Sequence, residues 1–321
     1  MKKFTHAWLA FMAIKRLESK AIPEMEGSNE LYPHAQALVK WFKDYRDFVI
    51  SGAWYPDDVF KDMSTSHIVK YIPIESEENR VFKKLPQTME IYNLMKMTSP
   101  LYGKQFTIDS GNACDRCESL AHNIVDDFKT QHKEEKGNPI APLNNNIAMR
   151  FFILSHYIAD CHMPLHCDKR PFSNDNYDVH AAIEKLWENE VTKSYKLDRP
   201  NLRFFYDPDG YPLKTSKCSD LILEVEKRIV EREYKHGWGV GNNNTWDYMS
   251  AITEYSYLMA YNWFPKGTDP DTLTSDVFKT MDAYLNWEED AIKIFCDAID
   301  SIARVWLHVW IRYRKWAKNK S

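Results

Sequence analysis

The sequence predicts an all-α fold, and three observations support this prediction. Glycine is scarce, with 10 residues in a chain of 321. Apolar residues recur at helical spacing through long segments, and the alternation of apolar and polar residues that indicates strands is rare. A hydrophobic fraction of 44% and a charged fraction of 27% are typical of a globular protein that buries its core without disulfides. No linker composition or internal repeat interrupts the chain, so the simplest architecture is one large helical domain spanning residues 1–321.

The N-terminal part of the chain contains two predicted helices and one irregular stretch. Phe4–Lys20 has an apolar stripe at helical spacing, and so does Leu31–Ile50, which ends before Gly52. The run Tyr55-Pro56-Asp57-Asp58 predicts a loop. Residues 69–109 are the least regular of the sequence, and we expect them to form an insertion in the domain.

Three helices are expected in the middle of the chain. Asn112–Lys136 is amphipathic and ends before the turn-forming residues Gly137-Asn138-Pro139. Leu143–Cys161 is strongly apolar on one face and stops near Pro164. His180–Lys193 follows a turn rich in Asn and Asp. Turn-forming residues predict further loops at 170–176, 207–212 and 237–244.

The C-terminal part is also helical, with segments Ser219–Tyr234, Trp246–Phe264 and Asp271–Lys318, the last expected to form two helices. Residues 294–318 are rich in Trp and end in basic residues. Such a segment can contact a membrane surface. Its apolar stripe favours a core helix whose basic residues complement the helix dipole.

The charge balance limits the partners. The 42 basic and 46 acidic residues give a net charge of −4. This excludes a generic nucleic-acid coat and a polybasic membrane binder, and predicts no specific nucleic-acid partner. It leaves open a nuclease whose metal ions contact the phosphate.

The N-terminus, MKKFTHAWLAFMAIKRL, resembles a signal peptide only superficially. Its apolar run is interrupted at Lys15 and Arg16, and no small-residue cleavage site follows. We interpret it as a helix of the mature protein, which makes the cytoplasm the default location. No apolar run approaches the roughly 20 residues that a transmembrane span needs.

The most informative segment is His156-Tyr157-Ile158-Ala159-Asp160-Cys161-His162-Met163-Pro164-Leu165-His166. His156 and Asp160 are four residues apart, so on a helix they share one face and can reach one metal ion. A His and an Asp on the packed side of an apolar helix are costly unless they are paired or bound to metal. Pro164 ends the helix, and His166 lies just beyond it. His162 is expected to point away from this face.

A second His/carboxylate pair follows at the same spacing, formed by His180 and Glu184. Imidazole and carboxylate ligands without thiolate fit zinc, with manganese or iron as alternatives. Upstream, a loop carboxylate at Asp57, Asp58 or Asp62 and the nearby His67 can complete a four-ligand set. His6 lies in the first turn of the N-terminal helix.

The cysteines are not expected to bind metal. Cys114 and Cys117 form one CxxC, whereas a structural zinc ribbon needs a second such pair. We predict buried or partly exposed thiols on a helix, and a redox role has little support. Cys161 and Cys167 flank the candidate ligands and are expected to contribute to packing.

These residues match a family pattern. The chain resembles the superfamily of zinc-dependent phospholipases C and single-strand-specific zinc nucleases, whose hallmark is a helix with His-x3-Asp-x5-His ending in Pro-Leu-His. Here these residues are His156, Asp160 and His166. The resemblance covers the N-terminal helix, the Trp-Tyr-Pro-Asp segment through His67, and residues 143 to 193. It implies an all-α domain with a metal cluster of up to three zinc ions in a cleft between helices.

The resemblance also implies a ligand set for each ion. The first ion would take Asp57, His67, His156 and Asp160, and the second would take His166, His180 and Glu184. The third would take His6, the shared carboxylate of Asp160, and the α-amino and carbonyl groups of Met1. In the family the N-terminal residue is a Trp exposed by removal of a signal peptide, so secretion is the alternative location. Met1 can replace that Trp because only backbone groups would bind the ion.

The activity implied by the resemblance is hydrolysis of a phosphodiester. Two metal ions sharing Asp160 would supply a hydroxide that attacks phosphorus. Asp57 or Asp58 is the candidate acid/base carboxylate. Glu184, where the nuclease branch has Asp, and the Tyr-Pro-Asp sequence at Asp57 favour a phospholipase C acting on phospholipid, with contact to a membrane surface. The alternatives are a single-strand nuclease or nucleotidase on the same metal site, and a non-catalytic protein that metal ions stabilise.

Overall fold

The computed structural model describes residues 1–19, 31–62, 67–73, 85–99, 105–135, 138–142, 144–175, 177–232 and 244–320. Helices dominate these residues, and the strands form three two-stranded antiparallel sheets. The predicted all-α class is therefore confirmed. Among the described residues no helix is both long and apolar enough to span a membrane.

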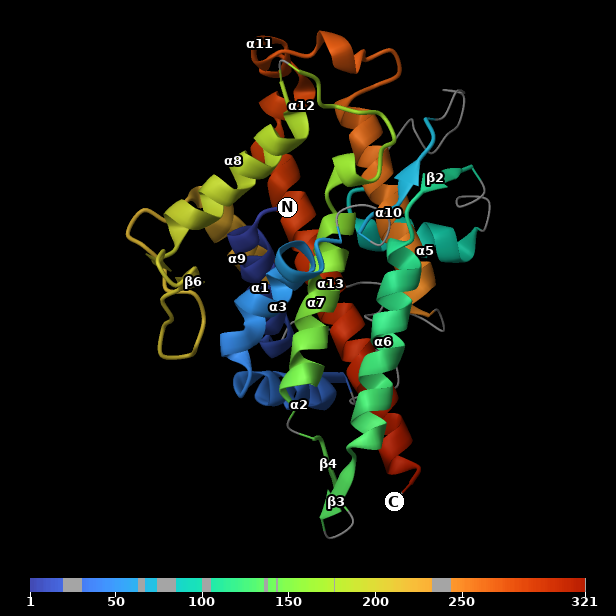
Figure 1. Cartoon of the computed structure of the whole chain (residues 1–321), viewed down its shortest axis with the longest axis vertical. Helices are drawn as coiled ribbons and strands as arrows, with labels where there is room; N and C mark the ends of the chain where they lie inside the picture. The colour runs from blue at the N-terminus through green and yellow to red at the C-terminus, as the bar shows by residue number, and fades with distance from the viewer. Residues whose placement is uncertain are drawn as a thin grey trace.

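Helix α13 (Trp287–Lys318) is the longest element and runs along most of the long axis of the molecule (Figure 1). Its first turn carries acidic residues and its last turn carries Lys315 and Lys318, which complement the helix dipole. Trp306, Val309 and Trp310 are buried. This confirms the prediction that the Trp-rich segment is a core helix.

Helix α1 (Lys3–Glu18) lies in the middle of the fold and packs against α13, α3 and α8. Thirteen of its side chains are buried, which explains why its apolar stripe is so broad. Helices α6 (Ala113–Thr130) and α7 (Asn145–Cys161) run beside α13 and contact each other (Figure 1). Asn144 caps α7 by accepting hydrogen bonds from the amides of Asn146 and Ile147.

The segment before the candidate site differs from its prediction. Helix α2 (Leu31–Lys43) ends seven residues earlier than expected, and a 3₁₀ turn, η1 (Arg46–Phe48), leads into α3 (Val49–Tyr55). The predicted loop at 55–58 is wrong, because α3 continues into a π-helical turn, η2 (Pro56–Phe60). Proline fits there because its φ of −58° is helical and continues the path of α3.

The remaining helices confirm the predicted segments with small shifts. A 3₁₀ turn, η4 (Pro164–His166), follows α7, and Asp178 caps α8 (Val179–Ser194). Helices α9 (Asp220–Glu231) and α10 (Thr245–Trp263) are capped by Ser219 and Asn244. The predicted loops at 170–176 and 207–212 are irregular where the structure describes them, whereas 237–243 lie outside the described residues.

Two predicted segments are divided further by the structure. Before α13, residues 270–285 form three short helices, η5 (Pro270–Thr272), α11 (Ser275–Phe278) and α12 (Asp282–Leu285). The expected insertion contributes α5 (Met89–Thr98), which packs on α10, and the pair β1 (Lys70–Tyr71) and β2 (Ile108–Ser110). The other strand pairs are β3 (Lys133–Glu135) with β4 (Asn138–Ile140) and β5 (Leu197–Asp198) with β6 (Arg203–Phe204).

Candidate metal centre

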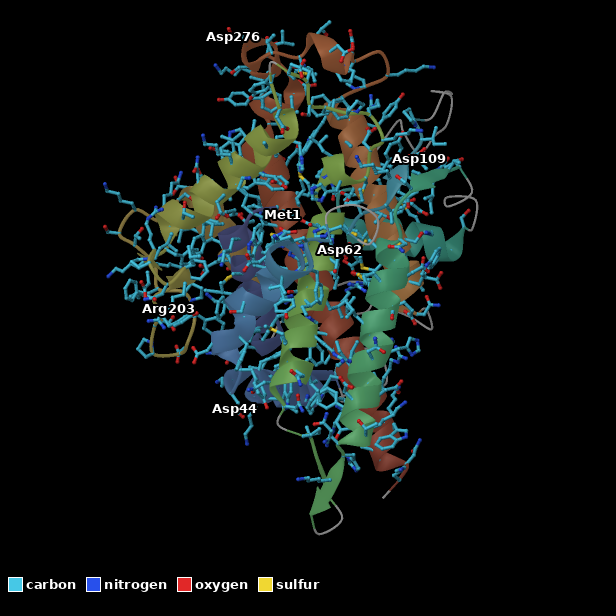
Figure 2. All side chains as sticks on the ribbon, viewed as in Figure 1. Met1, Asp44, Asp62, Asp109, Arg203 and Asp276 are labelled. Atoms are coloured by element: carbon cyan, nitrogen blue, oxygen red, sulfur yellow. The ribbon has the colours of Figure 1, made fainter. Side chains whose placement is uncertain are left out.

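The candidate ligands come from several separate elements that meet near the middle of the molecule. Met1 precedes α1, His67 precedes β1, and the others lie on α1, η2, α7, η4 and α8. Figure 2 shows Met1 and Asp62 in the central part of the molecule, whereas Asp44, Asp109, Arg203 and Asp276 lie toward its periphery. Residues far apart in the sequence therefore meet at one place in the fold.

The first group surrounds the side chain of His156 on α7. The Nε2 atoms of His156 and His67 are 2.7 Å apart. Asp160 Oδ2 lies 2.5 Å from His67 Nε2 and 3.4 Å from His156 Nε2. Asp57 Oδ1 lies 3.3 Å and 3.4 Å from the same two nitrogens. These four side chains therefore direct their donor atoms at one point.

Backbone carbonyls fix which ring nitrogens are available. The Nδ1 of His156 lies 2.7 Å from the Ala53 carbonyl oxygen, and the Nδ1 of His67 lies 2.5 Å from that of Asp62. Only a protonated Nδ1 can donate to a carbonyl, so in the neutral rings both Nε2 atoms carry lone pairs. Two lone pairs facing each other at 2.7 Å require a cation or a proton between them. The site therefore fits a metal ion.

The contact between the Ala53 carbonyl and His156 depends on the close packing of helices α3 and α7. A Cβ atom on Gly52 would lie 2.5 Å from the Cβ of Phe152 and 3.0 Å from the Sδ of Met149. Glycine therefore lets α3 pack closely on α7. The close packing places the carbonyl of Ala53 against the ring of His156.

The second group repeats the pattern at η4 and α8. The Nε2 atoms of His166 and His180 are 2.8 Å apart, and Glu184 Oε1 lies 3.5 Å and 3.1 Å from them. His166 Nδ1 lies 3.1 Å from the carbonyl oxygen of Asp160. The Nε2 of His166 is therefore again the ring nitrogen whose lone pair can bind a metal ion. His166, His180 and Glu184 thus form a second set of converging ligand atoms.

Asp160 connects the groups through its two carboxylate oxygens. Its Oδ2 faces the first group, whereas its Oδ1 lies 2.8 Å from the α-amino nitrogen of Met1 and 3.2 Å from His6 Nε2. The Met1 nitrogen also lies 2.6 Å from Glu184 Oε1. Asp160 therefore has the geometry of a bridging carboxylate.

His6 is the least satisfied residue of the site. Its buried Nδ1 makes no hydrogen bond with the described part of the chain, and its Nε2 approaches Asp160 Oδ1 at 3.2 Å without hydrogen-bond geometry. Its ring stacks on that of His156 with centroids 4.0 Å apart, and it also groups with Asp57. Burying an imidazole without hydrogen bonds costs folding free energy, and a bound metal ion would remove this cost. The burial of His6 therefore favours a role as a metal ligand.

Burial and charge control the protonation of the cluster. Burial alone would lower the pKa of the Met1 amino group, but the charges of Asp160 and Glu184 raise it to about 10. Burial and the neighbouring His156 lower the pKa of His6 to about 3. Burial opposes ionisation of Asp160, yet the N-terminal ammonium and His6 hold its pKa well below the usual value. The carboxylates are thus ionised at neutral pH, while Met1 would release a proton to bind a metal ion.

The groups open into one pocket of about 470 Å³. Seven candidate ligands line it, together with the apolar side chains of Trp54, Ile68 and Leu165 and the basic side chains of Lys2 and Lys70. Asp57, on the π-helical turn, is 14% exposed at this pocket. A small anionic group has access to the converging ligand atoms from this side.

The structure brings together all of the residues predicted from the sequence and resolves one alternative. Asp57 faces the two histidines, whereas Asp58 is exposed and Asp62 contributes its backbone carbonyl. His162 points to Ser301 on α13, with Nε2 and Oγ 2.9 Å apart, so it is buried rather than at the surface. Sequence reasoning missed Lys70 and Leu165 in the pocket wall, and no side-chain pattern signals the carbonyls of Ala53 and Asp62.

The cysteines agree with their prediction. Cys114 and Cys117 are buried free thiols on α6, and Cys161 and Cys167 are buried free thiols beside the candidate ligands. Burial raises the pKa of each of these thiols above the usual value. They are therefore protonated and poorly suited to bind metal as they stand.

Comparison with known proteins adds no relative. No protein-family model, no curated protein and no solved structure matches this chain.

Proposed function

We propose that this chain is a zinc-dependent phosphodiesterase of the phospholipase C kind. The observation that supports this most strongly is the pair of facing imidazoles in each group, with Nε2 atoms 2.7 Å and 2.8 Å apart and carboxylates beside them. Facing acceptors of this kind fit bound cations. The resemblance to the zinc phospholipase C and nuclease superfamily supplies the class of reaction.

Zinc suits the donor set because the site offers imidazole nitrogens and carboxylate oxygens and no ionised thiol. Up to three ions would be held, as the resemblance implies. The proposed ligands are Asp57, His67, His156 and Asp160 for the first ion, His166, His180 and Glu184 for the second, and Met1, His6 and Asp160 for the third. The Met1 nitrogen also contacts Glu184, so the second and third sites adjoin.

Bound zinc would lower the pKa of a water molecule and polarise a phosphoryl oxygen. Two side chains have further roles next to the bound zinc. Asp160 holds the groups together through its two oxygens. Asp57 reaches the pocket from the π-helical turn η2 and is the candidate group for accepting the proton of the attacking water. The apolar side chains of Trp54, Ile68 and Leu165 limit access of bulk water.

Two substrate classes remain in competition. Glu184 and the Tyr-Pro-Asp sequence at Asp57 favour a phospholipid. A single-strand nuclease or nucleotidase is the second candidate, because Trp54 in the pocket offers a ring on which a base can stack. The third candidate function is not catalytic: metal ions would only stabilise the fold.

The experiment combines metal content with hydrolysis. The purified chain is loaded with zinc, its metal content is measured, and cleavage of phosphatidylcholine, phosphatidylinositol phosphate and single-stranded DNA is followed with and without chelator. About three zinc ions per chain and chelator-sensitive lipid cleavage are expected. Mass mapping of the N-terminus shows whether Met1 is retained.

Asp57 and Asp58 provide a matched pair of variants. Asp57→Asn is expected to lower kcat by about 100-fold or more, the usual effect of losing a general base. Asp58→Asn changes an exposed neighbour and is expected to retain activity. DNA cleavage without lipid cleavage would favour the nuclease, and zinc binding without either activity would favour the structural role. A chain that binds no metal would refute the proposal.

A further inference from the structure

The pocket contains two basic side chains that the proposed chemistry does not use. Its acidic residues are Asp57, Asp160 and Glu184, and all three belong to the proposed ligand sets. Lys2 and Lys70 are the remaining charged side chains among the described residues of its wall. Their positive charges therefore have no counterpart there once the carboxylates bind metal.

Lys70 is held in place by its backbone. Its neighbour Tyr71 donates its amide to the Cys167 carbonyl at 3.0 Å, and the Tyr71 carbonyl accepts from the Lys169 amide at 3.2 Å. On the other side, Gly111 packs so closely on Ile68 that a Cβ atom would lie 2.1 Å from the Ile68 carbonyl oxygen. The strand that carries Lys70 is thus fixed between η4 and the start of α6.

The two ammonium groups are available to a ligand. Lys70 makes no ion pair within 4 Å of any residue that the structure describes, and Asp109, on which its charge acts, pairs directly with Lys169. Lys2 is 42% exposed, and its Nζ lies 3.7 Å from Glu184 Oε2, a long and weak contact. Metal binding by Glu184 would weaken this contact further.

We infer that Lys2 and Lys70 select a phospholipid headgroup that carries a second anionic group beside the scissile phosphate. This inference rests on the proposed function. Zinc ions bound at the proposed ligand sets would outweigh the three carboxylates, so the loaded pocket would be positive even before the lysines are counted. The single negative charge of a phosphodiester would leave most of this positive charge without a counterpart. A second phosphate or carboxylate on the headgroup would reduce the excess positive charge.

A zwitterionic headgroup fits this pocket poorly. A quaternary ammonium would lie among two lysines and the metal ions, and like charges in one site repel. Trp54 is the one aromatic ring other than histidine among the described residues of the wall, so no aromatic cage compensates for that repulsion. The lysines therefore act as specificity determinants rather than as groups of the reaction.

The test compares two soluble lipids, dihexanoyl phosphatidylinositol phosphate and dihexanoyl phosphatidylcholine, on the zinc-loaded chain. The wild type is expected to prefer the anionic lipid in kcat/KM. Lys70→Gln and Lys2→Gln are each expected to reduce that preference by about tenfold, the equivalent of about 1.4 kcal/mol. Calorimetry provides a second readout, in which each substitution weakens binding of inositol bisphosphate and leaves binding of phosphocholine unchanged.

Two lysines outside the pocket serve as controls. Lys3 follows Lys2 but lines a separate hollow with Asp47 and Arg203, and Lys169 lies beside β1 but pairs with Asp109 at 2.5 Å. Lys3→Gln and Lys169→Gln are expected to keep the wild-type preference. Zinc content and circular dichroism are measured on all four variants to check that each one folds.

The outcomes separate the two proposals. If the zinc-loaded wild type hydrolyses neither lipid, the proposed function fails and the headgroup inference fails with it. If it hydrolyses lipid but prefers phosphatidylcholine, or if Lys70→Gln and Lys2→Gln keep the preference, the inference alone is overturned. An effect of both substitutions on cleavage of single-stranded DNA but not of lipid would also overturn it and assign the lysines to a nucleic-acid substrate.

Discussion

Helix α1 carries two buried polar clusters that differ in one respect. Near its start, His6 and the preceding Met1 belong to the candidate metal centre. Near its end, Arg16 donates from Nε to Asp300 Oδ1 at 2.8 Å and from Nη2 to the Arg232 carbonyl at 2.9 Å. Both clusters bury ion pairs on the same helix, but only the first also contains histidine nitrogens that face each other.

The second cluster, which we call the Arg16 network, consists of Arg16, Arg232, Asp297, Asp300 and the amide of Met89. Arg232 reaches Asp297 Oδ1 at 2.9 Å and Asp300 Oδ2 at 3.0 Å. Asp297 Oδ2 accepts from the Met89 amide at 2.9 Å. Its charges are neutralised within the chain, as buried ion pairs in a stable core must be.

The metal centre is built in the opposite way. In their neutral forms, His67 and His156 present lone pairs to each other and to carboxylate oxygens, because backbone carbonyls already accept their Nδ1 hydrogen atoms. The comparison teaches that burial and charge do not by themselves indicate a metal ligand. Hydrogen-bond acceptors that face one another without a donor between them do indicate one.

The largest effect on zinc binding is expected from a substitution at Asp160, the bridging carboxylate of the metal centre. Asp160→Asn keeps the shape of the side chain but removes the charge that both of its oxygens present. In the wild type, zinc at about a thousand times its dissociation constant is expected to stabilise the fold by about 4 kcal/mol. In the variant this stabilisation is expected to fall to the part that the second ligand set, His166, His180 and Glu184, supplies without Asp160. Urea unfolding with zinc and with chelator measures both.

The comparison fails if zinc stabilises wild type and Asp160→Asn equally. The matched control is Asp297→Asn in the Arg16 network, which removes the same charge from another buried carboxylate. That variant is expected to lower stability with and without zinc by similar amounts. A dependence on zinc there would show that the two clusters are coupled.

A smaller effect is expected in the Arg16 network. Arg16→Met leaves Asp300 with one charged partner, Arg232, and breaking a buried pair in this way costs about 3 kcal/mol. Zinc content is expected to remain that of the wild type, because Arg16 donates to Asp300, Ser19 and the Arg232 carbonyl near the other end of α1. Denaturant unfolding and metal analysis on the same sample give both quantities. A loss of zinc from this variant would contradict the independence of the clusters.

Most of the fold could be predicted because its helices are long and their apolar stripes are regular. The period of 3.6 residues found α1, α7, α8 and α10 to within a few residues. It could not find the break after Lys43, since helical spacing continues across the turn. Pro56 indicated a loop, but its φ of −58° fits the helical path of α3 into η2.

The site was predictable for a different reason. His156 with Asp160, and His180 with Glu184, are pairs at a spacing that serves one metal ion, and the structure places both pairs on helices. Asp57 could not be distinguished from Asp58 in sequence because the helical turn that separates their directions was unforeseen. Lys70 was missed because its role depends on a two-residue strand whose position is set by tertiary contacts.

The smallest effect concerns His162, a buried histidine at the end of α7 whose Nε2 lies 2.9 Å from Ser301 Oγ. Burial lowers its pKa to about 3, against the opposing charge of Asp300, whereas an unfolded histidine titrates near pH 6.5. Between these values the unfolded state binds one more proton, so stability rises with pH across the window and is complete above it. Each such histidine contributes a slope of at most about 1.4 kcal/mol per pH unit.

His162→Gln tests this contribution because glutamine can still hydrogen-bond to Ser301 Oγ. The metal-free chain, unfolded in urea between pH 4.5 and 6.5, is expected to lose about one proton from its pH dependence in the variant. His6 should retain its own contribution, since burial and His156 also lower its pKa to about 3. An unchanged slope would mean that His162 is protonated in the folded chain. The charge of Asp300 in the Arg16 network would then outweigh the cost of burying a charged ring.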